Sequence, residues 1–317
     1  MIIIGVDGGG TKTAIEAYAA VMSGAELGAG GLGEPLAKTA AGPMNYNFIG
    51  VNGAVGNLMD GIRALGIRSE EIAAIGIGDP SIDDCLPQDE QSPTARFIEE
   101  VQKRTGAPVF LRSDAYITLF GLTEGREPAV LQLSGTGAMV IAQNGSGEIR
   151  VAGGWGRLTG DEGSGYYIAV EAIKAALHAA DGIGPDTALL AAALQYFGAE
   201  VPRDLIGIFY ADPEPDIAGF AKEAARCAEA GDTIAQGILL NAARYLAAYT
   251  SELIDWSSSR KAGVYGSVIC GNQTVRQEYE KILKSKYDGI TIMEPPVSAT
   301  EAAASYAVRM LEQHGQG

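Results

Sequence analysis

Two short apolar segments open the chain and enclose a polar, glycine-rich turn. Residues 2–6 and 14–20 are rich in aliphatic side chains, which predicts two strands. Because the segment after the turn reads as a strand rather than a helix, and no second Gly-Lys-Ser/Thr follows, the turn is not a Walker A loop. The pattern therefore predicts a β-hairpin. A third antiparallel strand is plausible here, and the glycine-rich stretch 28–33 is expected to be a turn.

Strands and helices alternate in the segment that follows. Residues 47–65 have helical spacing, residues 72–78 read as a buried strand, residues 93–104 as a helix and residues 108–111 as a strand. Such alternation is typical of an α/β sheet.

The pattern restarts near Ala129. Strands are expected at 130–133 and 139–143 around the turn 134–137, so each half of the chain opens with a strand, a glycine-hydroxyl turn and a strand. This weak internal repeat predicts two related lobes. A strand is expected at 263–265, and Ser298, Thr300 and Glu301 predict the start of a last helix that returns to the first lobe. Further helices are predicted at 164–180, 186–196, 217–230 and 233–256.

Length and composition agree with a two-domain globular protein. The chain has 317 residues, of which 47% are hydrophobic and 20% charged, so it can bury substantial cores. No apolar run reaches the length of a membrane-spanning helix, and no basic region precedes an apolar stretch at the N-terminus. We expect a cytoplasmic protein without a membrane partner.

Charge and cysteine usage exclude several function classes. A formal charge of −16 repels nucleic acid and anionic lipid, although ATP would arrive with Mg2+ and meet local backbone donors. Cys85, Cys227 and Cys270 are isolated, and His178 and His314 lack neighbouring ligands. A structural zinc site and a disulfide framework are therefore not expected.

The first turn has the chemistry of a phosphate-binding site. Its three glycines lack Cβ atoms, so they can take φ > 0 and bring backbone N–H groups up to a polyphosphate. A carboxylate at the strand end can hold Mg2+ directly or through water, and the hydroxyl-Lys-hydroxyl triplet adds donors and one charge. A plain glycine-rich hairpin is the alternative. The candidate cofactor-binding residues are Asp7, Gly8, Gly9, Gly10, Thr11, Lys12 and Thr13, with Asp7 as the metal ligand.

Six motifs, in order and spanning nearly the whole chain, resemble those of the BadF/BadG/BcrA/BcrD-type ATPase family, and within it the N-acetylglucosamine kinases. They are D-G-G-G-T-K-T at 7–13, Ser113-Asp114-Ala115, S-G-T-G at 134–137, G-G-W-G at 153–156, G-D-E-G-S at 160–164 and Y-G-S-V at 265–268. The resemblance implies an actin/hexokinase-type α/β fold, in which two ribonuclease-H-like lobes surround an ATP cleft. We expect the first lobe to comprise residues 1–115 and about 298–317, and the second residues 116–297.

The resemblance also implies an activity. An ATP- and Mg2+-dependent kinase would transfer the γ-phosphate to the 6-hydroxyl of N-acetylglucosamine or a related hexosamine. Asp114 matches the family's catalytic carboxylate, which would also touch the sugar and accept the proton of the attacking hydroxyl. From the residues alone, Asp114 could instead be a helix N-cap, and Ser113 could serve as that cap equally well.

Further residues match the family's nucleotide site. Gly135, Thr136 and Gly137 would form a second phosphate hairpin. Gly266 and Ser267 would lie against the adenosine, where a side chain on Gly266 would obstruct the nucleotide. A tight turn is the structural alternative at both places.

The remaining matches concern the sugar. An amide and a carboxylate can hydrogen-bond ring hydroxyls, and an indole can form a flat wall against a pyranose or an acetamide. Core packing is the alternative for the indole, while the neighbouring Glu162 is expected to have a structural role. The candidate sugar-binding residues are Asn45, Asp114, Gly154, Trp155 and Asp161.

One loop departs from the resemblance. Residues 76–81 read G-I-G-D-P-S, where family members more often carry Gly-Ala-Gly or Ser-Gly-Gly. The departure leaves glucosamine, N-acetylmuramic acid and other hexosamines open as substrates.

Two other roles are possible within this fold. An ATPase activator of a radical dehydratase requires paired cysteines for its iron–sulfur cluster, and this chain lacks them at matching positions. Kinase-like repressors usually carry a helix-turn-helix before the kinase fold, whereas Met1 here is adjacent to the first strand. We therefore expect a kinase acting on a small amino sugar, with a possible homodimer.

Overall fold

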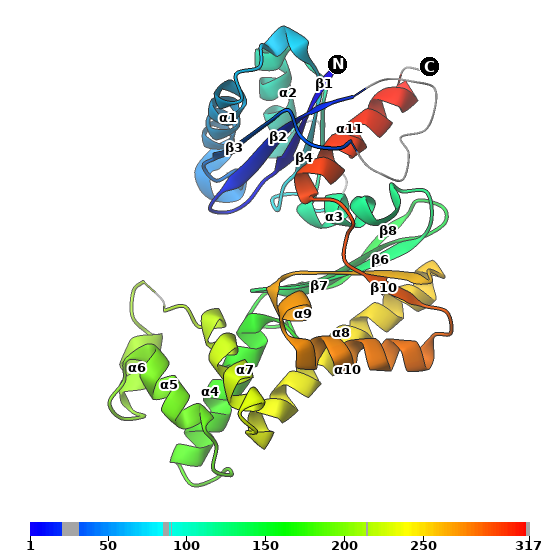
Figure 1. Cartoon of the computed structure of the whole chain (residues 1–317). Coiled ribbons are helices and arrows are strands. Elements are labelled where there is room, and N and C mark those ends of the chain that lie inside the picture. Colours follow the sequence, from blue (N-terminus) through cyan, green and yellow to red (C-terminus); the bar gives the residue numbers. More distant parts are fainter. Residues whose placement is uncertain (21–31, 85–88, 90, 214, 315–317) are drawn as a thin grey trace. The chain divides into compact units, whose positions relative to one another are not determined.

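A computed structural model describes residues 1–20, 32–84, 89, 91–213 and 215–314 (Figure 1). The chain divides into two compact units. Unit 1 comprises residues 1–127, 146–149 and 295–317, and unit 2 comprises residues 128–145 and 150–294. The lobe boundary expected after residue 115 falls within a helix, α3, that lies in unit 1.

Unit 1 contains a five-stranded sheet in the order β3-β2-β1-β4-β5. The first three strands along the chain are antiparallel, and β1, β4 and β5 are parallel. The predicted hairpin and third antiparallel strand are therefore confirmed, while residues 28–31 lie outside the described part. The elements are β1 (Ile2–Asp7), β2 (Thr13–Ala19), β3 (Ala37–Ala41), α1 (Tyr46–Ala64), η1 (Ser69–Glu71), β4 (Ile72–Gly78), α2 (Pro93–Thr105), β5 (Val109–Arg112), α3 (Asp114–Thr123) and α11 (Ala299–His314).

The parallel strands bring three chain segments to one edge of this sheet. Asp7 on β1 lies opposite Gly78 on β4, and Gly78 lies opposite Arg112 on β5. Because parallel strands end at the same edge, the residues that follow them lie close together although they are far apart in sequence.

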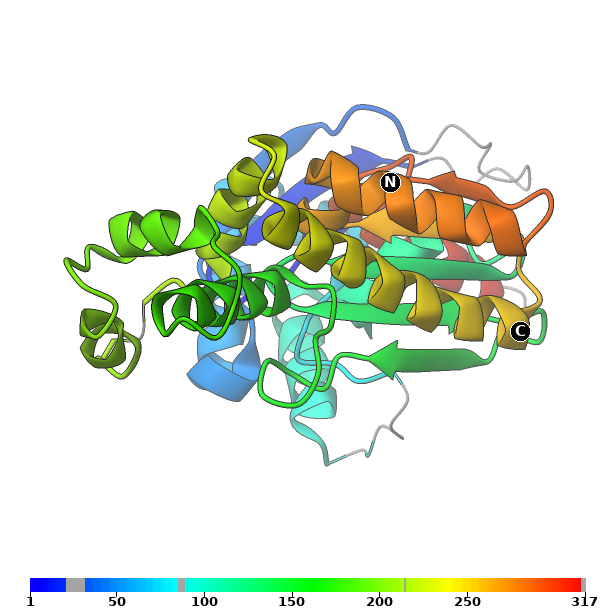
Figure 2. The ribbon, with the colours of Figure 1, turned by 90° about the horizontal axis from the view of Figure 1, so that it is seen from below.

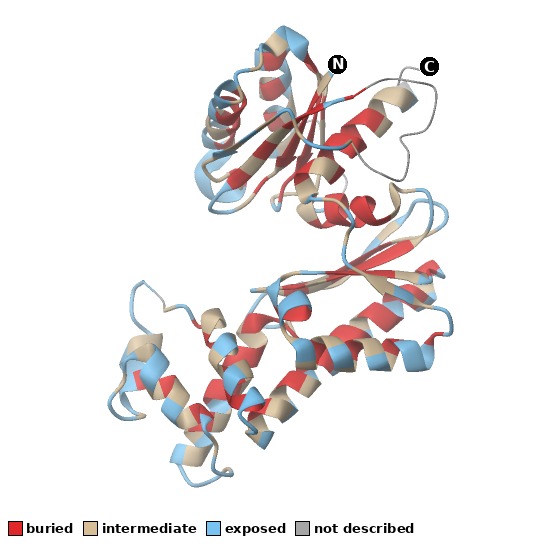
Figure 3. Cartoon of the chain, viewed as in Figure 1, coloured by how far each residue is buried: buried red, intermediate tan, exposed pale blue. Residues whose placement is uncertain are grey.

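The last helix packs on the first sheet, as predicted. Ser298 Oγ accepts a hydrogen bond from the Glu301 N–H at 3.1 Å, which caps α11. A Cβ atom on Gly5 would lie 1.9 Å from the Thr300 carbonyl oxygen, and one on Gly76 would lie 1.9 Å from the Ala303 carbonyl oxygen. Glycines on β1 and β4 thus allow the helix backbone to contact the sheet directly. The helix presents buried small residues to the sheet (Figure 3).

Unit 2 contains a second five-stranded sheet in the order β10-β9-β6-β7-β8. The antiparallel pair β6 and β7 encloses the second glycine-hydroxyl turn, which confirms the repeated strand–turn–strand pattern. Its elements are β6 (Ala129–Ser134), β7 (Ala138–Gln143), β8 (Ile149–Gly153), α4 (Gly165–Ala180), α5 (Leu189–Phe197), α6 (Asp204–Phe209), η2 (Ala218–Phe220), α7 (Ala221–Glu229), α8 (Thr233–Ser257), β9 (Lys261–Tyr265), α9 (Ser267–Gly271), α10 (Gln273–Lys286) and β10 (Thr291–Met293).

The long helix α8 forms the centre of the unit 2 core. It packs on β6 and β7, and α10 runs beside it (Figure 2). A buried polar contact joins these layers, because the Thr250 hydroxyl on α8 donates to Gln132 Oε1 on β6 at 2.9 Å and lies 3.0 Å from the Tyr279 hydroxyl on α10. None of the helices in the described residues is both long and apolar enough to span a bilayer.

Candidate active site

The first turn, between β1 and β2, is fixed by backbone hydrogen bonds on both sides. The Gly8 N–H donates to the Gly78 carbonyl at 2.8 Å, and the Met44 N–H donates to the Gly9 carbonyl at 3.0 Å. The turn is thus attached to the end of β4 and to the segment that precedes α1.

The glycines of this turn are needed for a different reason from the one predicted. None of them has a positive φ, so that expectation was wrong. A Cβ on Gly8 would instead lie 2.8 Å from Asp79 Oδ2, and one on Gly9 would lie 2.4 Å from the Lys12 carbonyl oxygen. A Cβ on Gly10 would have no neighbour within 4 Å. Close contacts, rather than backbone conformation, exclude side chains at the first two positions: with the loop after β4 at Gly8, and within the turn itself at Gly9.

The polar residues of the turn differ in their surroundings. Thr11 and Lys12 are exposed, as expected of phosphate-binding groups. Thr13 is fully buried, and its hydroxyl donates to the Gly42 carbonyl oxygen at 2.8 Å. The structure therefore does not bring the Thr13 hydroxyl to the surface of the turn.

Three carboxylates lie at the carboxyl edge of the first sheet. Asp7 ends β1, Asp79 follows β4, and Asp114 begins α3 just beyond β5. Ser113 is the N-cap of α3, because its Oγ accepts from the Tyr116 N–H at 2.9 Å. The interpretation of Asp114 as the cap is therefore wrong. Its half-buried carboxylate instead accepts, through Oδ1, from the neighbouring Ala115 N–H at 2.8 Å.

Burial perturbs all three groups. It raises the pKa of Asp7 to about 6, with a further contribution from the charge of Asp114. It also raises the pKa of Asp79, again with repulsion from Asp114, and the pKa of Asp114, with repulsion from Asp84. Among the described residues, none of the three carboxylates forms a salt bridge. This concentration of uncompensated negative charge favours a cation.

Asp84 was not predicted as part of the site, and it supports Asp114 indirectly. It accepts from Arg112 Nε at 2.6 Å, from the Ser113 N–H at 3.2 Å and from the Ser113 hydroxyl. Asp84 thus fixes the junction between β5 and α3, from which Asp114 projects. Nothing in the sequence near Asp84 indicates this contact, because its partners lie 28 and 29 residues away.

Asn45 lies beside the first turn. It is the N-cap of α1, with Oδ1 accepting from the Asn47 N–H at 3.1 Å, and the preceding residue, Met44, is bonded to the turn. Gly50 has φ 73° and separates the turn after Asn45 from the rest of α1. The predicted sugar-binding amide and the predicted phosphate turn are therefore neighbours.

The second turn lies against the start of α4. The Gly135 N–H donates to the Gly137 carbonyl at 2.9 Å, and the N–H groups of Gly165 and Tyr166 donate to the carbonyls of Gly135 and Thr136 at 2.8 and 3.2 Å. The Thr136 side chain is exposed. A rigid turn thus presents a hydroxyl at the surface of unit 2.

Gly266 contacts the same turn. It has φ 111°, and a Cβ would lie 2.5 Å from the Ser134 carbonyl oxygen and 3.1 Å from the Gly135 nitrogen. The backbone of the turn therefore requires glycine at 266, independently of any nucleotide. Ser267 follows as the first residue of α9.

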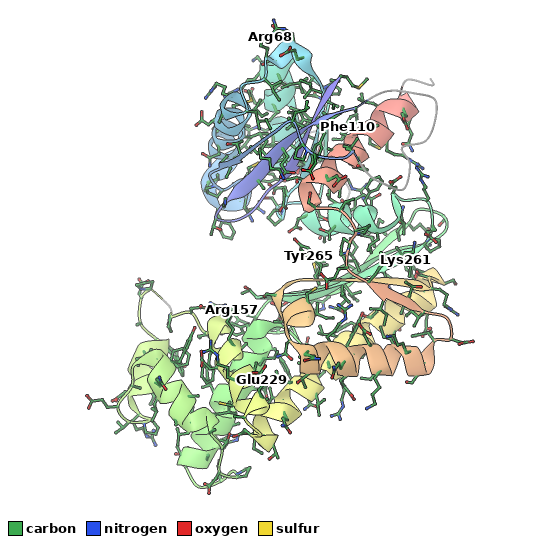
Figure 4. All side chains as sticks on the ribbon, in the orientation of Figure 1. Arg68, Phe110, Arg157, Glu229, Lys261 and Tyr265 are labelled. Carbon is green, nitrogen blue, oxygen red and sulfur yellow. The ribbon has the colours of Figure 1, made fainter. Side chains whose placement is uncertain are left out.

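A cavity of about 470 Å³ opens beside these residues within unit 2. Gly135, Thr136 and Ser267 line it, as do Lys222 and Arg226 on α7. Glu229 lines it from the same helix (Figure 4). Lys222 and Arg226 were not predicted as site residues. The sequence places them on one predicted helix but shows no motif around them. The cavity combines turn backbone, hydroxyls and basic groups, which suits a phosphorylated ligand.

The predicted sugar loop also lies in unit 2. Trp155 is 75% exposed, which excludes core packing for its indole. Gly154 has φ 72°, and a Cβ there would lie 3.1 Å from the Met139 Cβ. The exposed indole therefore projects from a loop whose backbone conformation favours glycine.

Asp161 joins the sugar loop to the second turn. It adopts the left-handed conformation, with φ 59°, and a Cβ on Gly137 would lie 3.0 Å from its Oδ2. Burial raises the pKa of Asp161, while hydrogen bonds from the backbone of Ala138 and Gly156 lower it. The adjacent Glu162 accepts from the Tyr249 hydroxyl at 3.0 Å, a structural contact of the kind expected for it.

Comparison with known proteins identifies close relatives of the chain. It is 30% identical over 303 residues to an N-acetylmuramic acid/N-acetylglucosamine kinase from Clostridium acetobutylicum, covering 92% of this chain and 93% of that protein. It is also 30% identical over 260 residues to an N-acetyl-D-glucosamine kinase from Dictyostelium discoideum, covering 77% and 76% of the two chains.

Solved structures support the fold. A Chromobacterium violaceum protein, provisionally named an N-acetylglucosamine kinase, superposes with a TM-score of 0.71 at 23% identity over 96% of this chain and 97% of that one. A ROK-family glucokinase from Streptomyces griseus, solved with glucose and AMPPNP, superposes with a TM-score of 0.57 at 17% identity over 98% and 99%. The two α/β units thus have the actin/hexokinase-like architecture of sugar kinases.

The family follows from the match along the chain itself. Residues 4–304 match the BadF/BadG/BcrA/BcrD ATPase family, from the first strand to the middle of α11. Both glycine-hydroxyl turns, the Asp114 segment and the sugar loop fall inside the matched range. The chain belongs to the BadF/BadG/BcrA/BcrD ATPase family.

Proposed function

We propose that the chain is an ATP-dependent amino-sugar kinase that phosphorylates the 6-hydroxyl of N-acetylglucosamine or a related hexosamine. The observation that carries this proposal is the half-buried Asp114 carboxylate, which has no salt bridge in the described residues and lies beside the first turn. Both 30%-identical relatives are named as kinases of N-acetylated amino sugars, which supports the substrate class.

Asp114 would act as the general base. Its carboxylate would accept the proton of the sugar 6-hydroxyl while that oxygen attacks the γ-phosphorus, and the bond to the bridging oxygen of ADP breaks. A base in this position also orients the nucleophile, which provides a large part of the rate enhancement in phosphoryl transfer. Asp84 holds the β5–α3 junction and so keeps the base in place.

The candidate nucleotide-binding residues fall into two groups, one in each unit. In unit 1, the first turn with Gly8, Gly9, Gly10, Thr11 and Lys12 would meet phosphate oxygens through N–H groups and one cation. In unit 2, Thr136 and Ser267 would contact phosphate and adenosine, with Lys222 on the cavity wall. Arg226 also lines the cavity, and its guanidinium is paired with Glu223 at 2.5 Å. Thr13 would contribute through its backbone, because its hydroxyl is bonded to Gly42.

Mg2+ fits Asp7. Its carboxylate is half-buried at the end of β1 without a cationic partner in the described residues, and carboxylate oxygens are preferred Mg2+ ligands. No group of three or more acidic, His or Cys side chains among the described residues could hold a metal ion directly. We therefore infer that Asp7 holds the ion through water, and that the bound ion would neutralise phosphate charge.

The candidate sugar-binding residues are Asn45 in unit 1 and Gly154, Trp155 and Asp161 in unit 2. Asn45 and Asp161 would hydrogen-bond ring hydroxyls, and the exposed Trp155 next to Gly154 would pack on the sugar or its acetamide. N-acetylmuramic acid is a second candidate acceptor, because the Clostridium relative is named for both sugars. The charge of −16 supports an enzyme without a nucleic-acid or anionic-membrane partner, and a cytoplasmic location remains part of the proposal. Size-exclusion chromatography would test the proposed homodimer.

A direct assay tests the function. Purified protein with ATP and Mg2+ should phosphorylate N-acetylglucosamine, glucosamine or N-acetylmuramic acid with a higher kcat/KM than glucose. NMR of the product should place the phosphate on carbon 6. A preference for glucose, or phosphate on the anomeric carbon, would overturn the proposal.

The nucleotide role of the second turn has its own test. Thr136→Val keeps the shape of the side chain but removes the hydroxyl, so the KM for ATP should rise about tenfold while the sugar KM stays within about twofold. Thr159→Val, in the exposed sugar loop, is a matched control that removes a hydroxyl bonded to the Trp155 carbonyl. Unaltered binding of an ATP analogue to Thr136→Val in calorimetry would show that the phosphates lie elsewhere.

A further inference from the structure

Two buried polar atoms in the loop after β4 have no hydrogen-bond partner. The loop comprises residues 79–81 and is called the β4 loop here. Asp79 is 1% exposed, and its Oδ1 accepts from the Ser81 N–H at 2.7 Å. Burial raises the pKa of Asp79 and the nearby Ser81 side chain partly offsets that rise, but neither Asp79 Oδ2 nor Ser81 Oγ forms a hydrogen bond of normal geometry. Native proteins pair nearly all buried polar atoms, so two unpaired atoms in one loop require an explanation.

The position of Asp79 relates it to the acceptor site of unit 1. Its Oδ2 lies 2.8 Å from where a Cβ on Gly8 would be, directly beside the first turn. The charges of Asp79 and Asp114 are close enough to affect each other, and Asp79 also acts on Tyr46, the residue after Asn45. Asp79 therefore lies among the first turn, the base and the predicted sugar-binding amide.

The loop is at the surface although these two atoms are shielded. Pro80, between them, is exposed, and Ser81 as a whole is only half-buried. A ligand that displaces the loop tip can therefore reach both side chains. This loop also belongs to the segment 76–81, whose sequence departs from the family resemblance.

We propose that the β4 loop positions the acceptor sugar, with Asp79 Oδ2 accepting a hydrogen bond from an O–H or N–H of the sugar and Ser81 Oγ providing a second contact. This inference rests on the proposed function and adds residues to its acceptor site. A sugar hydroxyl or amide supplies the donor that Oδ2 lacks. A phosphate group cannot do so, because it would place one anion against another.

Asp79→Asn is the primary test. Asparagine has the same shape and keeps the acceptor for the Ser81 N–H, but it replaces Oδ2 with a donor. The KM for the amino sugar should rise about tenfold, since one hydrogen bond to a buried charged group is lost, while the KM for ATP stays within about twofold. The Tm of the unliganded protein should be unchanged or higher, because asparagine keeps the acceptor for the Ser81 N–H and removes a buried charge at Oδ2, which has no hydrogen bond to lose.

Matched variants and substrates sharpen the result. Ser81→Ala should raise the sugar KM by a smaller factor, and Asp83→Asn, the same substitution at an exposed position of the following segment, should change neither KM. The penalty of Asp79→Asn should disappear for whichever of 2-deoxyglucose and the 1-deoxy, 3-deoxy and 4-deoxy forms of N-acetylglucosamine lacks the group that Asp79 contacts. Persistence of the full penalty with all four would overturn the proposal.

Other outcomes also overturn it. These are a sugar KM within twofold of wild type in Asp79→Asn, a rise confined to the ATP KM, or a lower Tm with both KM values unchanged. Failure of the proposed function looks different, because the wild type would then phosphorylate no amino sugar. In that case the role of Asp79 is tested by the Tm increase that N-acetylglucosamine causes in the absence of ATP. The increase should be present in the wild type and lost in Asp79→Asn. Its absence from the wild type would overturn the role of Asp79.

Discussion

Asp114→Asn should lower kcat for sugar phosphorylation by ~100- to 10,000-fold, the usual effect of removing a general base. Asparagine keeps one acceptor oxygen but cannot take the proton of the 6-hydroxyl, so the KM for the sugar should stay within a small factor. The Tm should not fall, because Ser113 rather than Asp114 caps α3. A coupled ADP-release assay and a thermal melt on the same preparation measure these quantities.

Two comparisons make the result specific to Asp114. Asp60→Asn, an exposed carboxylate on α1, should leave kcat unchanged. Because burial raises the pKa of Asp114, wild-type kcat should fall as the pH drops through that raised value, and Asp114→Asn should lack this limb. If its kcat remained within a few-fold of wild type, Asp114 would not be the base.

Gly76→Ala should strongly destabilise unit 1, as should Gly5→Ala, whose Cβ would meet a carbonyl oxygen of α11 at the same distance. The Cβ that Gly76→Ala adds would lie 1.9 Å from the Ala303 carbonyl oxygen, so α11 would have to move away from β4. Overpacking against backbone costs about 3 kcal/mol, at the upper end of the usual range. Gly10→Ala adds the same atom where nothing lies within 4 Å, and should change the free energy of unfolding little.

The part of the structure that Gly76→Ala destabilises can be identified separately. Hydrogen exchange in α11 peptides should accelerate in Gly76→Ala. The native tryptophan emission should stay unchanged, because Trp155 and Trp256 both lie in unit 2. An unfolding free energy equal to that of Gly10→Ala would show that α11 does not contact the sheet as closely as described.

The local patterns of this sequence were sufficient for most of the fold. Aliphatic runs between glycine turns predicted both hairpins, and β4 has the bounds that its apolar run indicated. Short or polar elements were missed: β10 has three residues, and α10 buries only Val275, Tyr279 and Leu283 along a narrow stripe of a charged helix. The predicted helix at 217–230 is interrupted, with the 3-10 turn η2 preceding α7.

The site was less predictable, because long-range contacts decide the roles of its residues. The need for glycine at Gly8 arises from Asp79, about seventy positions later, and the need at Gly266 arises from the backbone of Ser134. Thr13 looks like a phosphate ligand in sequence, yet its hydroxyl is bonded to Gly42. A motif fixes which residues are present, whereas their neighbours determine which atoms remain available to a ligand.

The discontinuity of unit 1 has a consequence for how the protein is made. Its sheet begins with β1, but α11, the helix that covers β1 and β4, follows all of unit 2 in the sequence. On the ribosome, all of unit 2 emerges before α11 can close over Gly5 and Gly76. One apolar face of the first sheet therefore stays exposed until α11 is synthesised, and unit 2 can fold before unit 1 is complete. Deletion of α11 would leave that apolar face uncovered. Stable folding of unit 1 therefore depends on a helix that follows unit 2 in the sequence.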